Sequence, residues 1–265
     1  MQASWLEPGF GGAAASRSYH VTMNSQRSRS VRVAWTVFGL LGVAHLAAQL
    51  LDADAVALDA DAVANVTQWF LMPVLAAIVW LSTETPRTRL VILVLIALGF
   101  SWLGDTAPDL ADGDTAFLLM VGFFLAAQAT YIAAFVPFNG RGVIRRHAGL
   151  VAVYAVAVVL LVAACAPGAG ALLVPALVYG TALGAMAVLS AGLGRTSAIG
   201  GGLFLVSDGM IALGAFADWF EPPAEGFWIM ATYIAAQVLI VLGVLARDRG
   251  HHSAVSAPQA LAGKG

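Results

Sequence analysis

Eight apolar stretches of roughly 20 residues each follow one another along this chain of 265 residues. A helix of that length crosses the hydrocarbon core of a bilayer, which is about 30 Å thick. The chain is 60% hydrophobic and 11% charged, against roughly 45–50% and 25% for soluble domains. We therefore predict an all-α membrane bundle of eight transmembrane helices. The predicted spans are 33–51, 63–81, 90–104, 116–136, 148–166, 171–193, 198–216 and 227–246, and the third is long enough only with its polar end.

The connectors between these stretches divide by charge. Arginines precede the first span and follow the second, fourth, sixth and eighth. Three of the four other connectors carry acidic residues, and none of the four carries Lys or Arg. Because basic loops stay in the cytoplasm, we predict a multi-pass protein of the plasma membrane with both termini cytoplasmic. With a net charge of -2, we expect the bilayer as a partner and no nucleic acid. The arginines are Arg27, Arg29, Arg32, Arg87, Arg89, Arg141, Arg145, Arg146, Arg195, Arg247 and Arg249.

The two ends of the chain differ in composition from the rest. Residues 1–30 are rich in Gly, Ser, Ala and Arg and resemble no signal peptide, so we predict a disordered cytoplasmic tail, within which Met23 is an alternative start. Residues 31–249 then form the transmembrane domain, and 250–265 form a second disordered cytoplasmic tail. The single cysteine, Cys165, lies in an apolar run, which excludes an intrachain disulfide.

A six-residue sequence occurs twice in the chain. Ala129–Ala134 and Ala231–Ala236 both read ATYIAA, and each follows an aspartate, Asp105 or Asp208, by about 25 residues. Both copies enter the membrane in the same direction, which favours two parallel four-helix repeats. Chance similarity in an alanine-rich sequence is the alternative.

Two aspartates are the acidic residues that the predicted spans place at or near membrane depth. A carboxylate inside a span costs about 3 kcal/mol, so Asp208 needs a function or a polar partner, while Asp105 lies nearer the outer end, where water reaches it. If the two carboxyl groups meet, one would hold a proton and the other would be charged, which is the arrangement used in acid-base hydrolysis. Alternatively, Asp208 bonds a neighbouring helix and Asp105 only ends its span.

Uncharged polar side chains at helical spacing would line the same cavity. Gln128 with Tyr131, and Tyr233 with Gln237, each share one face of a helix. For each polar residue taken singly, a hydrogen bond between helices is the alternative to a binding role. With so few histidines and cysteines at membrane depth, we expect no metal and no cofactor. The full set of predicted binding residues is Gln68, Gln128, Tyr131, Ser207, Tyr233, Gln237 and His45.

Two helix pairs resemble the YhhN family of membrane proteins. One is Gly99–Phe135, with LGD at 103–105 and FLAAQATYI at 124–132; the other is Gly200–Leu245, with FLVSD at 204–208, ATY at 231–233 and Gln237. The resemblance implies a lysoplasmalogenase, which hydrolyses the vinyl ether bond of a lysolipid to a fatty aldehyde and a glycerophospho-ethanolamine or glycerophospho-choline. It also implies that Asp105 and Asp208 are the catalytic pair.

Two positions depart from the family pattern, and two other functions stay open. Gln128 stands where many relatives carry histidine and Gln68 where many carry lysine, which would alter the rate or the substrate. A non-catalytic lipid binder or transporter, with Asp208 as proton-coupling site, also fits parallel repeats and a membrane carboxylate. An intramembrane aspartyl protease fits less well, because Trp102 replaces the first glycine of its Gly-x-Gly-Asp motif.

Overall fold

The computed structural model describes residues 11–51, 59–140 and 148–262, and these residues form α-helices and short 3-10 helices without a β-strand. The predicted all-α fold is therefore confirmed. Each long helix covers one of the predicted apolar stretches. The helices are α1 (Gly11–Ala48), α2 (Ala60–Ser82), α3 (Arg89–Thr106), α4 (Gly113–Phe135), α6 (Ala148–Ala169), α7 (Leu173–Ser190), α8 (Arg195–Phe216) and α9 (Glu225–Ala262).

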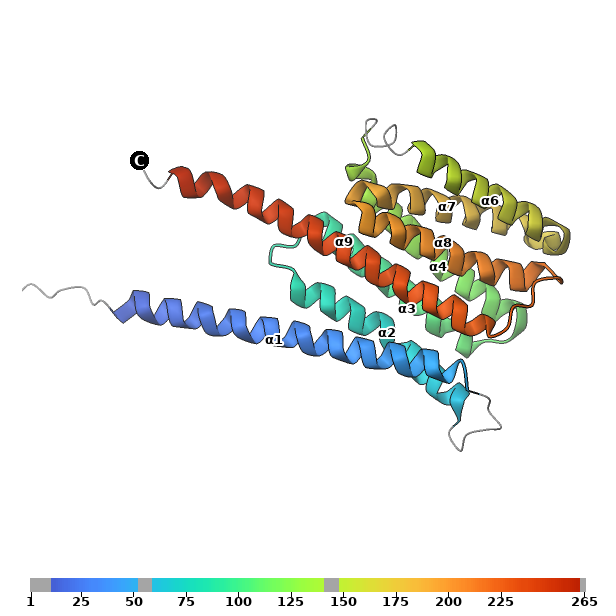
Figure 1. Cartoon of the computed structure of the whole chain (residues 1–265), viewed down its shortest axis with the longest axis horizontal. Helices are drawn as coiled ribbons and strands as arrows, with labels where there is room; N and C mark the ends of the chain where they lie inside the picture. Colours follow the sequence, from blue (N-terminus) through green and yellow to red (C-terminus); the bar gives the residue numbers. More distant parts are fainter. Residues whose placement is uncertain (1–10, 52–58, 141–147, 263–265) are drawn as a thin grey trace, which may run out of the picture.

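Seven segments within the described residues are long and apolar enough to cross a membrane, so the protein is a multi-pass membrane protein. One of these segments, Ala148–Leu193, has 46 residues and contains both α6 and α7. Between the two helices lies the 3-10 helix η3 (Gly170–Leu172), where Gly170 has a φ of 48° that glycine adopts without strain. The chain turns back at this glycine, and α6 and α7 lie side by side (Figure 1).

Both terminal helices run further than the apolar stretches do. We predicted disordered tails at 1–30 and 250–265, but α1 begins at Gly11 and α9 ends at Ala262. Most of each predicted tail is thus helical, and residues 1–10 and 263–265 lie outside the described part of the chain. Alanine, which is frequent in both segments, favours a helix once a membrane span has nucleated it. Both extensions leave the bundle at the same end (Figure 1).

The helices pack in an order that brings the two halves of the chain together. Along one side, α1 packs on α2, α2 on α3 and α3 on α4, and α4 then contacts α7, whose other neighbours are α6 and α8. The last helix, α9, packs mainly on α8 and also contacts α1, α2 and α3 (Figure 1). The fully buried residues Leu98, Tyr131, Phe204 and Ile240 show that α3, α4, α8 and α9 share one core.

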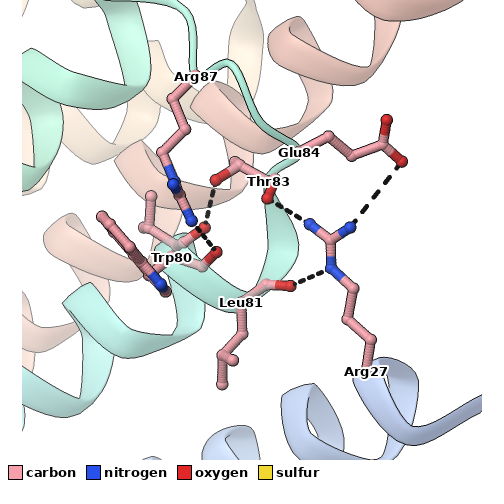
Figure 2. Close-up of polar contacts among 7 residues, drawn as sticks. Arg27, Trp80, Leu81, Thr83, Glu84 and Arg87 are labelled. Carbon is pink, nitrogen blue, oxygen red and sulfur yellow. Dashed lines mark hydrogen bonds and ion pairs between the residues drawn. The ribbon is translucent and has the colours of Figure 1, made fainter. Parts of the chain in front are cut away.

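Arg27 fixes the position of α1 against the end of α2 (Figure 2). Its guanidinium donates hydrogen bonds to the carbonyl oxygens of Leu81, at 2.8 Å, and Thr83, and lies 3.9 Å from the Glu84 carboxylate. The last carbonyl groups of a helix have no partner within the helix and carry partial negative charge, which a cation stabilises. An arginine from the segment before the first span therefore caps the C-terminal end of α2.

Candidate active site

Asp208 lies inside the bundle, about two turns before the end of α8 at Phe216. Its side chain is only 5% exposed, and its Oδ2 atom accepts a hydrogen bond from the hydroxyl of Tyr179 on α7. A carboxyl group at this depth needs such a donor, because lipid and apolar side chains offer none. The structure thus places Asp208 within a helix that is long and apolar enough to cross a membrane, and adds a tyrosine partner from the neighbouring helix.

Asp105 lies on the last turn of α3 and is also buried, with 7% of its surface exposed. The hydroxyl of Tyr233 on α9 donates a hydrogen bond of 2.9 Å to its Oδ2 atom. We expected water to reach this carboxyl group because it is close to the helix end. That expectation was wrong, since Tyr233 from the last helix packs over it.

The two carboxyl groups belong to one site. They come from different halves of the chain, both are buried, and Phe124 lies between their surroundings, since it lines the cavity at Asp208 and contacts Tyr233, the partner of Asp105. Each is held by one tyrosine hydroxyl from another helix, Tyr233 for Asp105 and Tyr179 for Asp208. Two buried carboxyl groups in one site are an arrangement that acid-base catalysis can use, with one group protonated and the other charged.

Phe124 on α4 contacts residues of α3, α8 and α9 around the two aspartates. Its ring meets the rings of Phe204 and Tyr233 edge to face, with centroids 6.4 and 5.8 Å away. The ring also lies against Gly104, the residue before Asp105, where a Cβ atom would be 2.8 Å from the Phe124 side chain. A glycine at 104 is therefore required for α3 and α4 to approach this closely, and that approach positions Asp105.

An apolar cavity of about 70 Å³ opens beside Asp208. It is formed by the first turns of α4 and α7 and the last turns of α6 and α8, at the end of the bundle opposite the arginines. Its walls include Phe117, Phe124, Cys165 and Phe216, while Asp208 and the Tyr179 hydroxyl are its polar groups. The space is large enough for a few water molecules or a short piece of alkyl chain, and one of its lining residues, Leu118, is exposed on the outside of the bundle.

Gln128 is a buried amide that lies close to Tyr179, a residue of the cavity wall, but is not itself part of that wall. It lies one turn further along α4 than Phe124 and close to the Tyr179 hydroxyl, and none of its surface is exposed. Neither its nitrogen nor its oxygen meets hydrogen-bond geometry with any described residue. A buried polar group without a partner costs stability and is characteristic of sites that bind water or a ligand.

Three other predicted binding residues join helices and do not face the cavity. The Tyr131 hydroxyl donates to Oε1 of Gln237 at 2.7 Å, and Nε2 of Gln237 donates to the Ser101 hydroxyl at 3.1 Å, which links α4, α9 and α3. Ser207 donates to the carbonyl oxygen of Ile229 at 3.0 Å, and so points toward α9 although it neighbours Asp208. These contacts match the packing alternative that the sequence left open.

The remaining two predicted residues lie on the α1 and α2 side. Nδ1 of His45 is 3.1 Å from the carbonyl oxygen of Ala64 and 3.0 Å from the Thr67 hydroxyl, which joins α1 to α2. Nε2 of Gln68 donates a hydrogen bond of 3.3 Å to the main-chain oxygen of Asp105, near the end of α3. The carboxyl group of Asp105 is bound by Tyr233 instead. Only Gln68 of this pair therefore touches a proposed catalytic residue.

Tyr179 and Phe124 were not among the site residues predicted from the sequence. Tyr179 is the only aromatic residue in the predicted span 171–193, and a lone tyrosine deep in a span is a signal that its hydroxyl has a polar partner. Phe124 gives no comparable signal, because phenylalanine is an ordinary residue of a membrane helix. Its role comes from the neighbours that the fold supplies.

Comparison with known proteins adds one finding. Residues 63–244 match the sequence model of a family described as the YhhN family. This match includes α3, α4, α6, α7 and α8, most of α2, residues 225–244 of α9, and both aspartates. No curated protein and no solved structure matches the chain.

Proposed function

The chain belongs to the YhhN family, and from this premise we propose that it is a membrane-embedded hydrolase of lysoplasmalogens. The reaction would cleave the vinyl ether bond and release a fatty aldehyde and a glycerophospho-ethanolamine or glycerophospho-choline. The observation that carries the proposal is the pair of buried carboxyl groups, Asp105 and Asp208, each of which accepts a hydrogen bond from a tyrosine hydroxyl inside the bundle. Hydrolysis of the related acetal bonds of glycosides also uses two carboxyl groups.

In the proposed reaction, the protonated carboxyl group of Asp208 gives its proton to the β-carbon of the vinyl ether. The α-carbon then becomes an oxocarbenium ion, and the Asp105 carboxylate stabilises this positive charge. Water adds to the α-carbon, and its released proton returns to the carboxylate pair. The resulting hemiacetal collapses by breaking its bond to the glycerol oxygen, which takes up a proton, so one water molecule is consumed for each aldehyde released. Asp208 is assigned as the donor because it lines the cavity.

The surroundings of Asp208 support a lipid substrate. A single alkyl chain would lie against Phe117 and Phe216 in the cavity, displacing side chains because the free space is only about 70 Å³. The unpartnered amide of Gln128 lies close by, beside Tyr179. It would hold the attacking water or an oxygen of the substrate, at the position where the family resemblance led us to expect a histidine.

We also propose how the chain lies in the membrane. As a straight helix, the 46 residues of Ala148–Leu193 would be about 70 Å long, more than twice the bilayer core. Since α6 and α7 pack against each other, this segment would cross twice, which gives eight spans in two parallel sets of four. The protein would lie in the plasma membrane with its arginine-rich end on the cytoplasmic side. The cavity at Asp208 would then lie at the level of the outer leaflet.

A lipid binder or transporter is the second candidate, since an apolar cavity with one carboxyl group also suits proton-coupled lipid movement. The two functions are separated by incubating the purified protein in detergent with lysoplasmalogen and measuring aldehyde release. The hydrolase predicts release that Asp105→Asn and Asp208→Asn both abolish. Absence of release from the wild-type protein, together with lysolipid binding that survives both changes, would reject the hydrolase in favour of the binder.

A further inference from the structure

A second and larger cavity lies at the opposite, arginine-rich end of the bundle. It has a volume of about 860 Å³ and is formed by the start of α3, the end of α4 with the following turn, and the part of α9 near Arg247. This volume falls within the range of roughly 300–1,000 Å³ that is typical of small-molecule sites. It shares no lining residue with the cavity at Asp208.

The walls of this α3/α9 pocket divide into an apolar and a cationic part. Leu90, Ala134, Phe138 and Leu193 supply apolar side chains, while two guanidinium groups, of Arg89 and Arg247, supply positive charge. Such a division fits a molecule that has an anionic head and an apolar remainder. A phospholipid at a membrane surface has this form, with its phosphate at the level where helices end.

The two arginines are available for an anion. Arg247 is held over the ring of Phe138, 5.0 Å from its centroid, which fixes the guanidinium without using its hydrogen-bond donors. Within the described residues, no hydrogen bond or ion pair joins either Arg89 or Arg247 to an acidic side chain. Arginine at such a site binds two oxygens of one phosphate.

The acidic residue of the pocket, Asp248, has a different contact. It is 4% exposed and accepts a hydrogen bond of 2.8 Å from the hydroxyl of Thr88, the residue that precedes α3. With two arginines and one aspartate in its lining, the α3/α9 pocket has a net positive charge. The first N–H groups of α3 add the positive end of a helix dipole at the same place.

Membrane orientation alone does not account for this arrangement. Arg32 and Arg195 lie at the same end of the bundle and satisfy the positive-inside rule, yet neither lines the pocket. We propose that the α3/α9 pocket binds the phosphate group of an anionic phospholipid, with Arg89 and Arg247 as the phosphate ligands. This site is independent of the reaction proposed at Asp208.

The test is to titrate the purified, delipidated protein in neutral detergent with phosphatidylglycerol and to count bound lipids by native mass spectrometry. Saturable binding is expected, and R89Q/R247Q should weaken it by about 10-fold or more. The matched control is R32Q/R195Q, which removes the same charge from the same end outside the pocket and should change binding less than about 2-fold. Equal losses in the two double variants, or no loss in R89Q/R247Q, would overturn the proposal.

Two further titrations identify the source of the phosphate. Phosphatidylcholine, whose phosphate carries a neutralising choline, should bind at least about 10-fold more weakly than phosphatidylglycerol. Inorganic phosphate should compete for the site only at millimolar concentration, because it lacks the contacts with Leu90 and Phe138. Binding of inorganic phosphate that depends on Arg89 and Arg247, with no binding of either lipid, would support the phosphate site and overturn the assignment to a lipid.

Discussion

The hydroxyl of Tyr233 donates a hydrogen bond to Oδ2 of Asp105 at 2.9 Å, and this contact joins α9 to α3 across 128 residues of sequence. Tyr131, the matching tyrosine of the other ATYIAA copy, donates to Gln237 and reaches neither aspartate. The two tyrosines have the same sequence context, but Tyr233 binds a carboxyl group whereas Tyr131 joins two helices.

This difference gives a paired prediction. Tyr233→Phe should lower turnover of lysoplasmalogen by about 10-fold or more, because the Asp105 carboxylate loses a charge-assisted hydrogen bond. Tyr131→Phe should leave turnover within about 2-fold and cost only about 0.6 kcal/mol of stability. Aldehyde release and thermal unfolding in detergent measure the two effects. Equal losses of activity would contradict the distinction between the tyrosines.

Asp208→Asn should abolish turnover while the protein stays folded. Asparagine fills the same space and still accepts the hydrogen bond from Tyr179, but it cannot deliver a proton to the substrate, a contribution worth about 100- to 10,000-fold. The control is Asp218→Asn, in the exposed connector after α8, which should behave as wild type. Wild-type rates of aldehyde release in the Asp208 variant would rule out its role as the acid.

Gln128→Leu and Gln237→Leu should change stability in opposite directions. The first removes an amide that has no partner among the described residues, and should raise stability by about 1 kcal/mol. The second leaves the hydroxyls of Tyr131 and Ser101 unpaired, and should lower it by about 1–2 kcal/mol. Unfolding of both variants in one denaturant series is the measurement.

The same Gln128→Leu variant should also lose activity, since in the proposed function the Gln128 amide holds the attacking water or an oxygen of the substrate. A gain in stability with a loss of turnover is typical of a functional site. A stabilised variant with full aldehyde release would show that the unpaired amide has no part in the reaction.

Gly104→Ala should destabilise the bundle by about 1–3 kcal/mol, because its Cβ atom would be 2.8 Å from the Phe124 ring and would push α4 from α3. Gly99→Ala is the matched control on the same helix, since nothing lies within 4 Å of its Cβ position. That variant should be neutral or slightly more stable. Similar melting temperatures for the two variants would show that α4 adjusts without cost.

Arg27→Ala should lower stability by about 1 kcal/mol, because the last carbonyl groups of α2 lose their cation (Figure 2). Arg29→Ala removes the same charge from an exposed position without a described side-chain contact and should cost less than half as much. Thermal unfolding of both variants tests this, and a deficit of Arg27→Ala that vanished in low salt would contradict a role in closing the helix.

The membrane fold and the two aspartates could be predicted from the sequence because both depend on local signals. An apolar stretch of about 20 residues has few alternatives to a membrane helix, and a carboxylate such as Asp208 in one is conspicuous. The family resemblance, now confirmed by the match over residues 63–244, rested on the same two helix pairs. Helical spacing likewise placed Tyr131 and Gln128 on one buried face of α4.

The partners of these residues could not be predicted, because they depend on how helices distant in sequence pack. Ser207 was predicted to bind substrate on account of its neighbour Asp208, yet successive residues of a helix face different directions, and Ser207 points toward α9. Tyr179 and Phe124 complete the site from α7 and α4. Those helices meet only because the second half of the chain packs against the first.

The bond between Tyr233 and Asp105 also sets an order for biogenesis. The ribosome delivers α3 to the membrane well before α9, which it completes last of the long helices in the described chain. Until α9 is inserted, the Asp105 carboxyl group has no hydrogen bond from Tyr233. The core contacts of α4 and α8 with α9 are also not yet formed. A chain that lacks the final helix is therefore incompletely packed, and under the proposed function it should release no aldehyde.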